Sequence, residues 1–289
     1  MNEIKNEKVA AVVVTFNRLE LLKKVVNGLR SQTRKIDQII IVNNSSTDGT
    51  LEWLNLQEDI ITVTQENTGS SGGQFTGAKT ALEMGFDWIW QMDDDVVADS
   101  ECLENLLKYA KKDLICVATK ITFQGDIFLA DIKKINITNP TKSIWGTMTN
   151  ENDFKDEIIS VEGFAFEGPF FHRSVLEKIG FAEKKFFIYA DDTEYSIRAL
   201  KQNFKAIIVK NAILRRQLPF PENEYIFGWK TYYMIRNLIA IDVLHGNFFV
   251  RWFRPFGYML TWIFRCKNFD NIKTVLRAFK DGYFYTRST

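Results

Sequence analysis

The sequence predicts an α/β fold, in which helices flank a mostly parallel sheet, followed by a helical C-terminal region. Short apolar runs alternate with amphipathic segments through the first 120 residues, as strands and helices do in a parallel sheet. Polar clusters follow directly on these apolar runs. Residues 226–289 hold 17 of the 40 aromatic residues, and their ten Lys/Arg against three Asp/Glu give a net charge of +7, which leaves −6 for the rest.

The first 120 residues contain four expected strands and three expected helices. β-branched apolar runs are typical of strands buried on both faces, whereas apolar residues three or four apart are typical of an amphipathic helix. We expect the third helix to end at Gly85, since glycine commonly follows a helix C-terminus. In chain order the elements are the strand KVAAVVVTF, the helix RLELLKKVVNGLRSQ, the strand DQIIIVNN, the short helix DGTLEWLNL, the strand IITVTQEN, the helix GGQFTGAKTALEMG and the strand WIWQM.

Beyond residue 120 the alternation gives way to extended segments, ICVATKITF and IISVEGFAF, which predict mixed or antiparallel strands. The helices SVLEKIG and ADDTEYSIRALKQ and the strand KAIIV follow, and the proline-interrupted PFPENEY predicts a linker. We therefore expect one domain over residues 1–225, with halves of about 1–120 and 121–225. A helical region over residues 226–289 completes the chain.

Composition excludes several classes of protein. With 289 residues, 46% of them hydrophobic, the chain can bury a large core. A net charge of +1 gives no sign of nucleic-acid binding. The three cysteines are too widely spaced for a disulfide framework or a metal site, which suits a reducing compartment. We expect no signal peptide, and no apolar run reaches the roughly 18 residues of a spanning helix.

The polar clusters occur at Thr15–Arg18, Asn43–Asp48, Asn67–Gly73 and Asp93–Asp95, each after an apolar strand. Parallel sheets bind ligands beyond the carboxyl ends of their strands, so all four clusters should line one crevice. In an extended chain Asp93 and Asp95 point the same way and can share a hard cation, while Asp94 faces elsewhere. The alternative is that these carboxylates only cap the following helix.

Two other clusters are less specific. The glycines of ENTGSSGGQFTG let backbone amides approach a ligand, but a tight turn with close helix packing explains them equally well. The spacing is neither GxxxxGK[ST] nor GxGxxG. In VNNSSTDGT, Asn43 or Asn44 could pair with a nucleobase, unless Thr47 or Asp48 merely caps a helix.

Three acidic residues, Asp191, Asp192 and Glu194, begin an expected helix. Crowding of like charges raises a carboxyl pKa towards the range useful for a general base. Acidic residues also favour the first turn of a helix on dipole grounds alone. From the residues by themselves, catalysis and capping remain equal alternatives.

Together these segments resemble the family 2 glycosyltransferases of GT-A fold, in the subgroup that includes bacterial galactofuranosyl- and rhamnosyltransferases. The resemblance covers roughly residues 9–240 in order and spacing. It implies an inverting, metal-dependent hexosyltransferase that uses a nucleotide-sugar donor. The matching segments are VVVTFNR, IIIVNNSSTDGT, ENTGSSGGQFTG, WIWQMDDDV, FHRSVLEKIGF, FFIYADDTEYSIRA and YYMIRN.

The resemblance also implies roles for particular residues. Asp93 and Asp95 would hold Mn²⁺ or Mg²⁺ against the diphosphate. Asp192 would be the base, with Asp191 and Glu194 orienting the acceptor or the base. The donor contacts it implies are Thr15, Asn17 and Arg18 in the nucleotide pocket, Asn44 near the base, Asn67, Gly72 and Gly73 at the nucleotide or donor sugar, and Asp94 near the ribose or donor sugar.

One segment departs from the family. Many members place a metal-binding histidine just after the strand matching KAIIVKNAIL, where this chain reads LRRQLP. Either Gln217 or water completes the metal shell, or Arg215 and Arg216 offset the diphosphate charge. Metal dependence is therefore less secure than the aspartates suggest.

The C-terminal region offers two alternatives of its own. In FFVRWFRPFGYMLTWIFRCKNF the aromatic rings and the cations Arg251, Arg254 and Arg265 suit a membrane surface or an oligomer interface. In WKTYYMIRN, Tyr232 with Arg236 and Tyr233 with Asn237 lie one helical turn apart. They predict either packing against the body or contact with an acceptor.

We therefore expect a glycosyltransferase of bacterial surface polysaccharide biosynthesis, cytoplasmic and peripheral at the inner face of the cell membrane. The resemblance favours galactofuranose from UDP-galactofuranose, transferred to a glycan or lipid-linked acceptor, with dTDP-rhamnose as the alternative donor. A nucleotide-sugar-binding scaffold without activity and a nucleotidyltransferase are alternatives from other classes.

Overall fold

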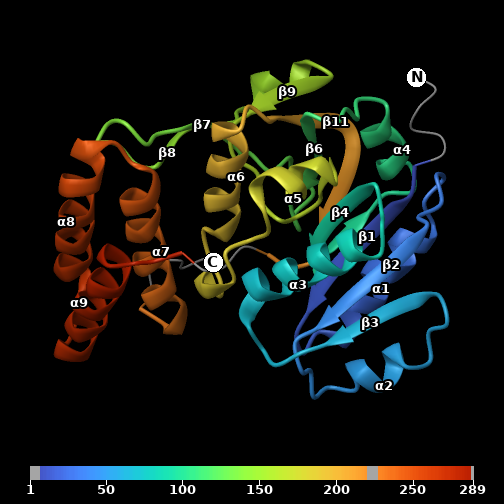
Figure 1. The fold of residues 1–289 in the computed structure, drawn as a ribbon, viewed down its shortest axis with the longest axis horizontal. Coiled ribbons are helices and arrows are strands. Elements are labelled where there is room, and N and C mark those ends of the chain that lie inside the picture. Colours follow the sequence, from blue (N-terminus) through green and yellow to red (C-terminus); the bar gives the residue numbers. More distant parts are fainter. Residues whose placement is uncertain (1–6, 220–226, 288–289) are drawn as a thin grey trace.

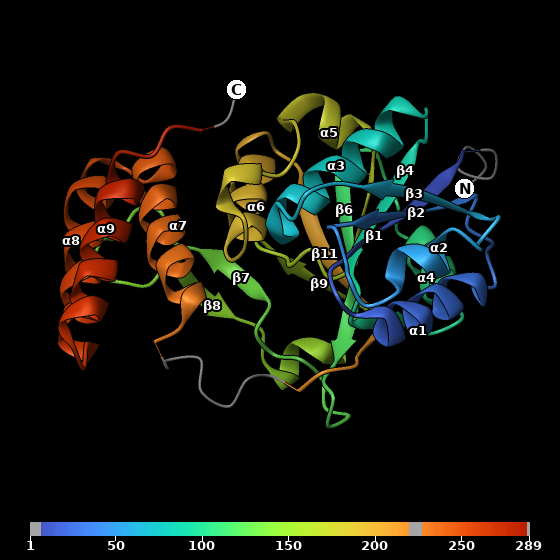
Figure 2. The same cartoon turned by 90° about the horizontal axis from the view of Figure 1, so that it is seen from below.

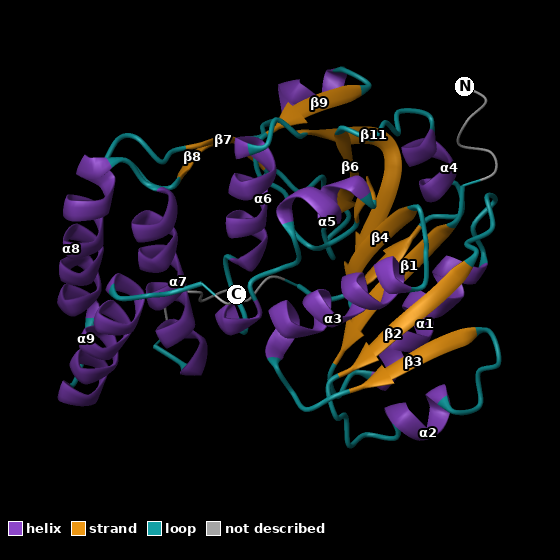
Figure 3. Ribbon diagram, viewed as in Figure 1, coloured by secondary structure: helices purple, strands orange, loops and turns teal. Residues whose placement is uncertain are grey.

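The computed structural model describes residues 7–219 and 227–287 (Figure 1). Most of the predicted linker PFPENEY and the expected domain boundary at residue 225 lie outside the described residues. Figure 3 shows the described chain as a body built on one large sheet and a C-terminal region that contains only helices. The expected α/β fold with a helical C-terminal region is thus confirmed.

The central sheet has nine strands in the order β3-β2-β1-β4-β10-β6-β11-β5, and β9 pairs with β11 beside this path. Strands β1 to β4 are mutually parallel, as are β6 and β11. Strand β10 runs antiparallel between β4 and β6, and β5 and β9 run antiparallel to β11. The strands are β1 Val9–Thr15, β2 Gln38–Asn43, β3 Ile60–Thr64, β4 Trp88–Asp93, β5 Val96–Ala98, β6 Leu114–Ile121, β9 Ile158–Val161, β10 Pro169–His172 and β11 Lys205–Arg216.

Each face of the sheet is covered by its own hydrophobic core, because successive residues of a strand point to opposite faces. On β1, Val9, Ala11 and Val13 belong to one core, and Ala10 and Val12 belong to the other. The helices covering the first face are α1 Leu19–Arg30, α2 Thr50–Leu54 and α4 Cys102–Leu107, and those covering the second are α3 Gly69–Glu83, α5 Ser174–Ile179 and α6 Asp191–Lys201.

The segment between β6 and β10 differs from the expected continuation of the sheet. Strands β7 (Ile132–Ile135) and β8 (Trp145–Met148) form a separate antiparallel pair. Of the predicted extended segment IISVEGFAF, only β9 is a strand. After β9 the backbone N–H of Gly163 donates to the carbonyl of Ile132, 3.0 Å away. The chain then buries Phe164 and Phe166 in the core, which outweighs further strand pairing.

The C-terminal region consists of three helices, α7 Trp229–His245, α8 Phe248–Arg265 and α9 Phe269–Tyr283. Figure 2 shows them packed side by side, with α7 nearest to the body. A small core joins α7 to the start of α6 through buried Leu238, Ala240 and Ile241. None of the described helices is long and apolar enough to cross a membrane.

One cation of the C-terminal region is not where the sequence suggested. Arg254 is 8% exposed, and its Nε donates to both carboxylate oxygens of Asp242 at 3.0 and 2.9 Å. Its Nη1 also donates to the carbonyl of Asn136 at 2.8 Å. Arg254 therefore holds α8 to α7 and to the body, and it does not lie on a surface that a lipid headgroup could reach.

Candidate active site

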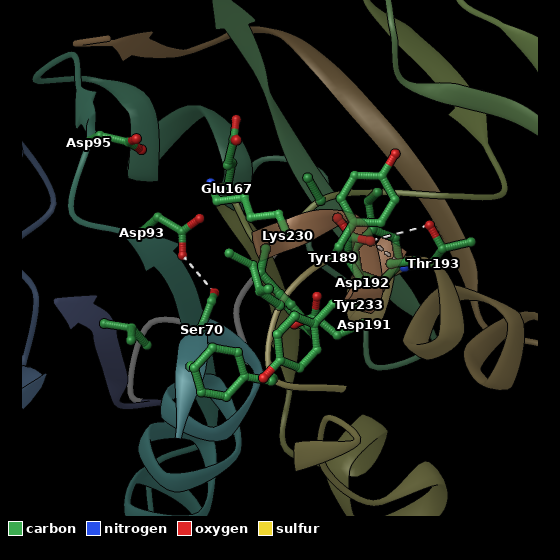
Figure 4. Close-up of a pocket in the computed structure, with 18 of the residues that line it drawn as sticks. Ser70, Asp93, Asp95, Glu167, Tyr189, Asp191, Asp192, Thr193, Lys230 and Tyr233 are labelled. Atoms are coloured by element: carbon green, nitrogen blue, oxygen red, sulfur yellow. Dashed lines mark hydrogen bonds between the residues drawn. The ribbon is translucent and has the colours of Figure 1, made fainter. Parts of the chain in front are cut away.

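A cavity of about 1280 Å³ lies at the carboxyl ends of the central strands, between the body and the start of α7 (Figure 4). Its volume exceeds the roughly 300–1,000 Å³ of pockets for a single small ligand, so two substrates can share it. The predicted site residues that line it are Thr15, Arg18, Asn44, Asn67, Asp93, Asp94, Asp95, Asp191 and Asp192; Asn17, Gly72, Gly73 and Glu194 do not line it.

Asp94 is buried against the end of β1. Its carboxylate accepts hydrogen bonds from Thr15 Oγ1 at 2.8 Å and from Arg18 Nη1 at 3.0 Å. The same Arg18 nitrogen donates to Asp95 at 3.0 Å. Asp94 and Asp95 form a turn after β4, so the extended geometry assumed for Asp93 and Asp95 is absent. Arg18 instead links the last two aspartates.

Asp93 ends β4 and forms no salt bridge among the described residues, although the charge of Arg18 also acts on it. Gln74 Nε2 donates to it at 3.2 Å, and Ser70 Oγ lies 3.5 Å away. Burial raises the pKa of Asp93 well above its ordinary value, and repulsion from Asp95 and Glu167 raises it further. A cation in this part of the cavity would lower the energy of ionised Asp93.

Glu167 is an acidic residue of the cavity that sequence reasoning missed. Arg216, at the end of β11, donates from Nη1 to both of its oxygens at 2.6 and 2.7 Å. Its signal in the sequence is a lone charge within the apolar run GFAFEGPFF. By contrast Arg215 pairs with Asp99 outside the cavity, and Gln217 donates its side-chain amide to the Arg215 carbonyl.

Asp93 and Asp95 have the ligand chemistry of a divalent-metal shell, although the turn at Asp94 and Asp95 means that they do not share the geometry of an extended chain. Carboxylate oxygens are the ligands that Mg²⁺ and Mn²⁺ prefer. Across the described residues, no three His, Cys, Asp or Glu side chains group closely enough to hold a metal by themselves. Magnesium commonly binds through one or two carboxylates together with substrate phosphates, and two aspartates facing one cavity meet that pattern.

Asp191 and Asp192 lie at the start of α6, after an unusual backbone segment. Phe187, Tyr189 and Ala190 all have positive φ, at 65°, 77° and 62°, which costs free energy unless contacts enforce it. Asn237 of α7 contributes such contacts: its amide nitrogen lies 3.1 Å from the Phe186 carbonyl and 2.7 Å from that of Tyr189. The C-terminal region thereby shapes the loop that presents the two aspartates.

Burial raises the carboxyl pKa of both aspartates. For Asp191 the neighbouring charge of Asp192 adds to the effect, and its Oδ2 is buried with no hydrogen-bond partner among the described residues. For Asp192, hydrogen bonds from Thr193 oppose the effect of burial. Thr193 Oγ1 lies 3.2 Å from Asp192 Oδ1, as Figure 4 shows. Either carboxyl group can therefore exchange a proton near neutral pH.

Glu194 points away from the cavity. Arg198 Nε donates to both of its oxygens at 2.9 and 2.8 Å, and His245 Nε2 lies 3.0 Å away. Burial alone would raise the pKa of Glu194, but the His245 hydrogen bond and the charge of Arg198 bring it below its ordinary value. Glu194 thus links α6 to α7.

The two glycines of the predicted donor site have no room for a side chain. A Cβ at Gly73 would lie 2.3 Å from Val14 on β1, and one at Gly72 would lie 2.2 Å from Thr68. Packing of α3 on β1 therefore accounts for Gly73, and the N-cap residue of α3, Thr68, accounts for Gly72.

The asparagines at the strand ends hold the loops of the cavity. Asn44 Nδ2 donates to the Gly69 carbonyl at 3.0 Å, and Asn67 Oδ1 accepts from the Gly69 amide at 2.9 Å. Asn17 has φ of 52° and accepts from the Thr47 amide at 2.7 Å. Of the three, Asn44 and Asn67 line the cavity.

Comparison with known sequences gives matches over most of the body. The model of the family described as Glycosyl transferase family 2 matches residues 10–180. Galactofuranosyltransferase GlfT1 of Mycolicibacterium smegmatis is 28% identical over 203 residues, or 68% of this chain and 66% of that protein. GlfT1 of Mycobacterium tuberculosis is 30% identical over 212 residues, or 68% of this chain and 65% of that protein. The matches thus span slightly less than two thirds of these relatives.

A more distant relative and two solved structures complete the comparison. O-antigen chain rhamnosyltransferase RfbN of Salmonella typhimurium is 22% identical over 220 residues, or 75% of this chain and 68% of RfbN. GalNAc-T7, solved with UDP, GalNAc and Mn²⁺, aligns with a TM-score of 0.70 and 11% identity over 96% of this chain and 56% of its own. S. aureus TarS 1–349 in complex with UDP aligns with a TM-score of 0.55 and 15% identity, over 83% of this chain and 66% of the TarS chain. At these identities the structures show a shared fold.

Proposed function

Because the chain belongs to glycosyl transferase family 2 and has the GT-A fold, we propose that it is an inverting galactofuranosyltransferase. It transfers galactofuranose from UDP-galactofuranose to a glycan or lipid-linked acceptor of the bacterial surface. The relatives named as galactofuranosyltransferases, at 28 and 30% identity, support this choice of sugar.

The observation that carries the proposal is the single cavity. It joins the polar ends of β1 and β4 with the start of α6, so a donor held at Asp93–Asp95 and a base at Asp192 would face the same space. A transferase that displaces a leaving group directly needs this arrangement, because the attacking and leaving oxygens lie on opposite sides of one carbon.

In the proposed reaction the acceptor hydroxyl attacks the anomeric carbon of the donor sugar. The new carbon–oxygen bond forms as the bond to the diphosphate breaks, and the hydroxyl proton passes to Asp192. Thr193 engages Oδ1 of Asp192, so we assign the proton to Oδ2. Asp191, next to it on the cavity wall, orients the acceptor.

At the other end of the cavity, Asp93 and Asp95 would hold Mn²⁺ or Mg²⁺. A bound metal would neutralise the departing diphosphate as a Lewis acid. Arg18 and Arg216 also line this part of the cavity, each paired with carboxylates. Their guanidinium groups can bind phosphate oxygens when the diphosphate displaces those partners.

A rhamnosyl donor, dTDP-rhamnose, is the second candidate, supported by the similarity to RfbN. The rivals from other classes differ in their products. A nucleotidyltransferase would consume a nucleoside triphosphate and release pyrophosphate, whereas a binding or scaffold protein would release nothing.

A screen of UDP-, dTDP- and GDP-sugars for release of nucleoside diphosphate tests the proposal. We expect release with UDP-galactofuranose, stimulation by Mn²⁺ and loss with a chelator. Release from dTDP-rhamnose alone would make dTDP-rhamnose the donor in place of UDP-galactofuranose. If a chelator does not change the release, the proposed metal is ruled out, and Arg18 and Arg216 would neutralise the diphosphate in its place.

We further propose that the enzyme works at the inner face of the cell membrane through α8. This helix exposes a row of large apolar side chains, together with the cations Arg251 and Arg265. Aromatic rings enter the headgroup zone while arginines meet anionic lipid. The exposed apolar side chains of α8 are Phe248, Phe249, Trp252, Phe253, Phe256, Leu260 and Phe264.

A further inference from the structure

We propose that the acceptor is a saccharide whose terminal ring binds an aromatic subsite formed by Trp145, Tyr189, Trp229 and Tyr233. This inference rests on the proposed function, because it identifies the second substrate of the same cavity. All four side chains line the cavity. They come from β8, from the loop before α6 and from α7, and Figure 4 shows Tyr189 and Tyr233 projecting into the cavity near Asp191 and Asp192.

Trp145 and Tyr189 lie beside the proposed base. Trp145 Nε1 donates to Thr193 Oγ1 at 3.4 Å, and Thr193 Oγ1 lies 3.2 Å from Asp192 Oδ1. The rings of Trp145 and Tyr189 meet edge to face, with centroids 6.2 Å apart. A molecule that brings a hydroxyl to Asp192 must therefore lie against these rings.

Trp229 and Tyr233 form a second pair on α7. Their centroids are 6.2 Å apart, and Tyr233 stacks on Phe187 at 4.9 Å with an interplanar angle of 21°. Trp229 lines the cavity and is 62% exposed. A tryptophan in a cavity with most of its surface open has contact area left for a ligand.

The mixture of groups indicates a sugar. One face of a sugar ring carries C–H groups that pack on aromatic rings, and its edge carries hydroxyls that bind carboxylates and amines. Here aromatic rings lie beside Asp191, Asp192 and Lys230. A bare lipid chain would leave these charges desolvated without partners, which is costly.

The donor base is a less suitable occupant of this subsite. In the sheet order, β3, β2 and β1 lie on one side of β4, and they bring Thr15, Asn44 and Asn67 to the cavity. The aromatic residues come from elements outside those strands and next to Asp192. Two ligands side by side also agree with a cavity of about 1280 Å³.

The test uses Trp229→Ala and Tyr189→Ala, with Trp229→Phe and Tyr189→Phe to restore a ring. Phe123→Ala is the control for loss of an exposed aromatic ring, because Phe123 is 58% exposed on the body and does not line the cavity. The probes are octyl β-D-galactopyranoside and octyl α-L-rhamnopyranoside below micelle concentration, with octanol as the control for the alkyl chain. Three quantities are measured: glycoside binding by saturation-transfer NMR, the acceptor KM in transfer, and donor hydrolysis without acceptor.

We expect both glycosides to bind and octanol not to bind. Each alanine variant should raise the acceptor KM roughly tenfold, the scale of one lost aromatic contact. Donor hydrolysis should stay unchanged, the phenylalanine variants should recover most of the binding, and Phe123→Ala should behave as wild type.

Three results would overturn the subsite: octanol binding as well as the glycosides, an unchanged KM in the alanine variants, or donor hydrolysis that falls in proportion to transfer. Failure of the proposed function is a separate outcome. If the wild-type protein binds glycosides through Trp229 but releases no nucleoside diphosphate from any donor, the aromatic subsite is supported and the proposed transfer reaction is contradicted.

Discussion

At the scale of single residues, the three aspartates after β4 divide into two kinds. Asp94 and Asp95 each form a salt bridge with Arg18, whereas Asp93 forms none among the described residues and is repelled by Asp95 and Glu167. Tandem aspartates in a sequence do not distinguish these roles, because a turn replaces the extended chain after Asp93. A bound metal would therefore favour the ionised form of Asp93.

Asp192→Asn tests the proposed base. The amide keeps the shape of the side chain but cannot accept the acceptor proton, so transfer should fall by roughly 10²–10⁴-fold. Binding of UDP, measured by calorimetry, should not change, because Asp192 is remote from the donor clusters in the chain and in the proposed role. Asp191→Asn should lower the rate of transfer less than Asp192→Asn does. If Asp192→Asn turns over as fast as the wild type, Asp192 is not the base.

The pH dependence of transfer follows from the same residue. Burial raises the pKa of Asp192 to about 6, and a general base acts in its deprotonated form. Activity should therefore be present above this pKa and lost as pH falls through it. A profile of kcat/KM against pH reports the free enzyme, and a flat profile between pH 5 and 7, taken as a rough window around the raised pKa, would contradict the assignment.

At the scale of elements, α7 supplies part of the cavity wall beside the sheet. Its Asn237 holds the loop before α6, and its first turns supply Trp229, Lys230 and Tyr233. Glu194, in the first turn of α6, lies 3.0 Å from Nε2 of His245, the last residue of α7. We infer that the C-terminal region is part of the site and that removing it would disorganise Asp191 and Asp192.

Asn237→Ala tests this coupling. The change removes the Asn237 hydrogen bonds to the carbonyls of Phe186, Ile188 and Tyr189. The Phe186 carbonyl keeps Arg236 and the Ile188 amide as donors, so the other two carry most of the loss, and the free energy of unfolding should fall by about 1–3 kcal/mol. At a temperature where the variant is still folded, kcat for transfer should also fall, because the loop that presents Asp191 and Asp192 has lost part of its support. Urea unfolding and kcat measure the two effects, and Asn55→Ala, at an exposed position after α2, should change neither.

Helix α8 should bind anionic vesicles. Replacing Phe249 and Phe253, which are 58% and 60% exposed, by glutamate removes apolar contact and adds repulsion from the lipid. Co-sedimentation with vesicles of anionic and neutral lipid should therefore be lost, while donor hydrolysis persists. Phe123→Glu, at a residue 58% exposed on the body, is the control. Undiminished sedimentation of the double variant, or dimers that dissociate on mutation, would favour the oligomer interface instead.

At the scale of the whole molecule, ligands should stabilise the fold through the cavity between its two parts. UDP with Mn²⁺ at 100 times its Kd would add about 2.7 kcal/mol to the free energy of unfolding. Differential scanning fluorimetry should show a higher Tm with both present and a smaller rise with UDP alone. Asp93→Asn should abolish the difference made by Mn²⁺, and a Tm indifferent to the metal in the wild type would oppose metal binding.

The alternation of apolar runs and helices was sufficient to predict the parallel part of the sheet, because a strand buried on both faces has to be apolar throughout, as Val9–Thr15 is. The same logic placed the strand-end clusters in one crevice. It could not predict the pairing of Glu167 with Arg216, which are 49 residues apart in the sequence. Nor could it predict the contact of Asn237 with the loop before α6, which lies at least 48 residues away in the sequence. Pairings over such distances depend on how elements pack.

The sequence by itself determined the family, the order of the elements and the end of the sheet at which the cavity lies, since these follow from local pattern and strand direction. Only the tertiary structure decided which candidates meet in the cavity. Glu194 pairs with Arg198 and His245, and Gly72 and Gly73 have no room for a side chain, although all three lie in matching segments. Sequence spacing fixes which face of an element a residue occupies, but what that face meets depends on packing between distant segments.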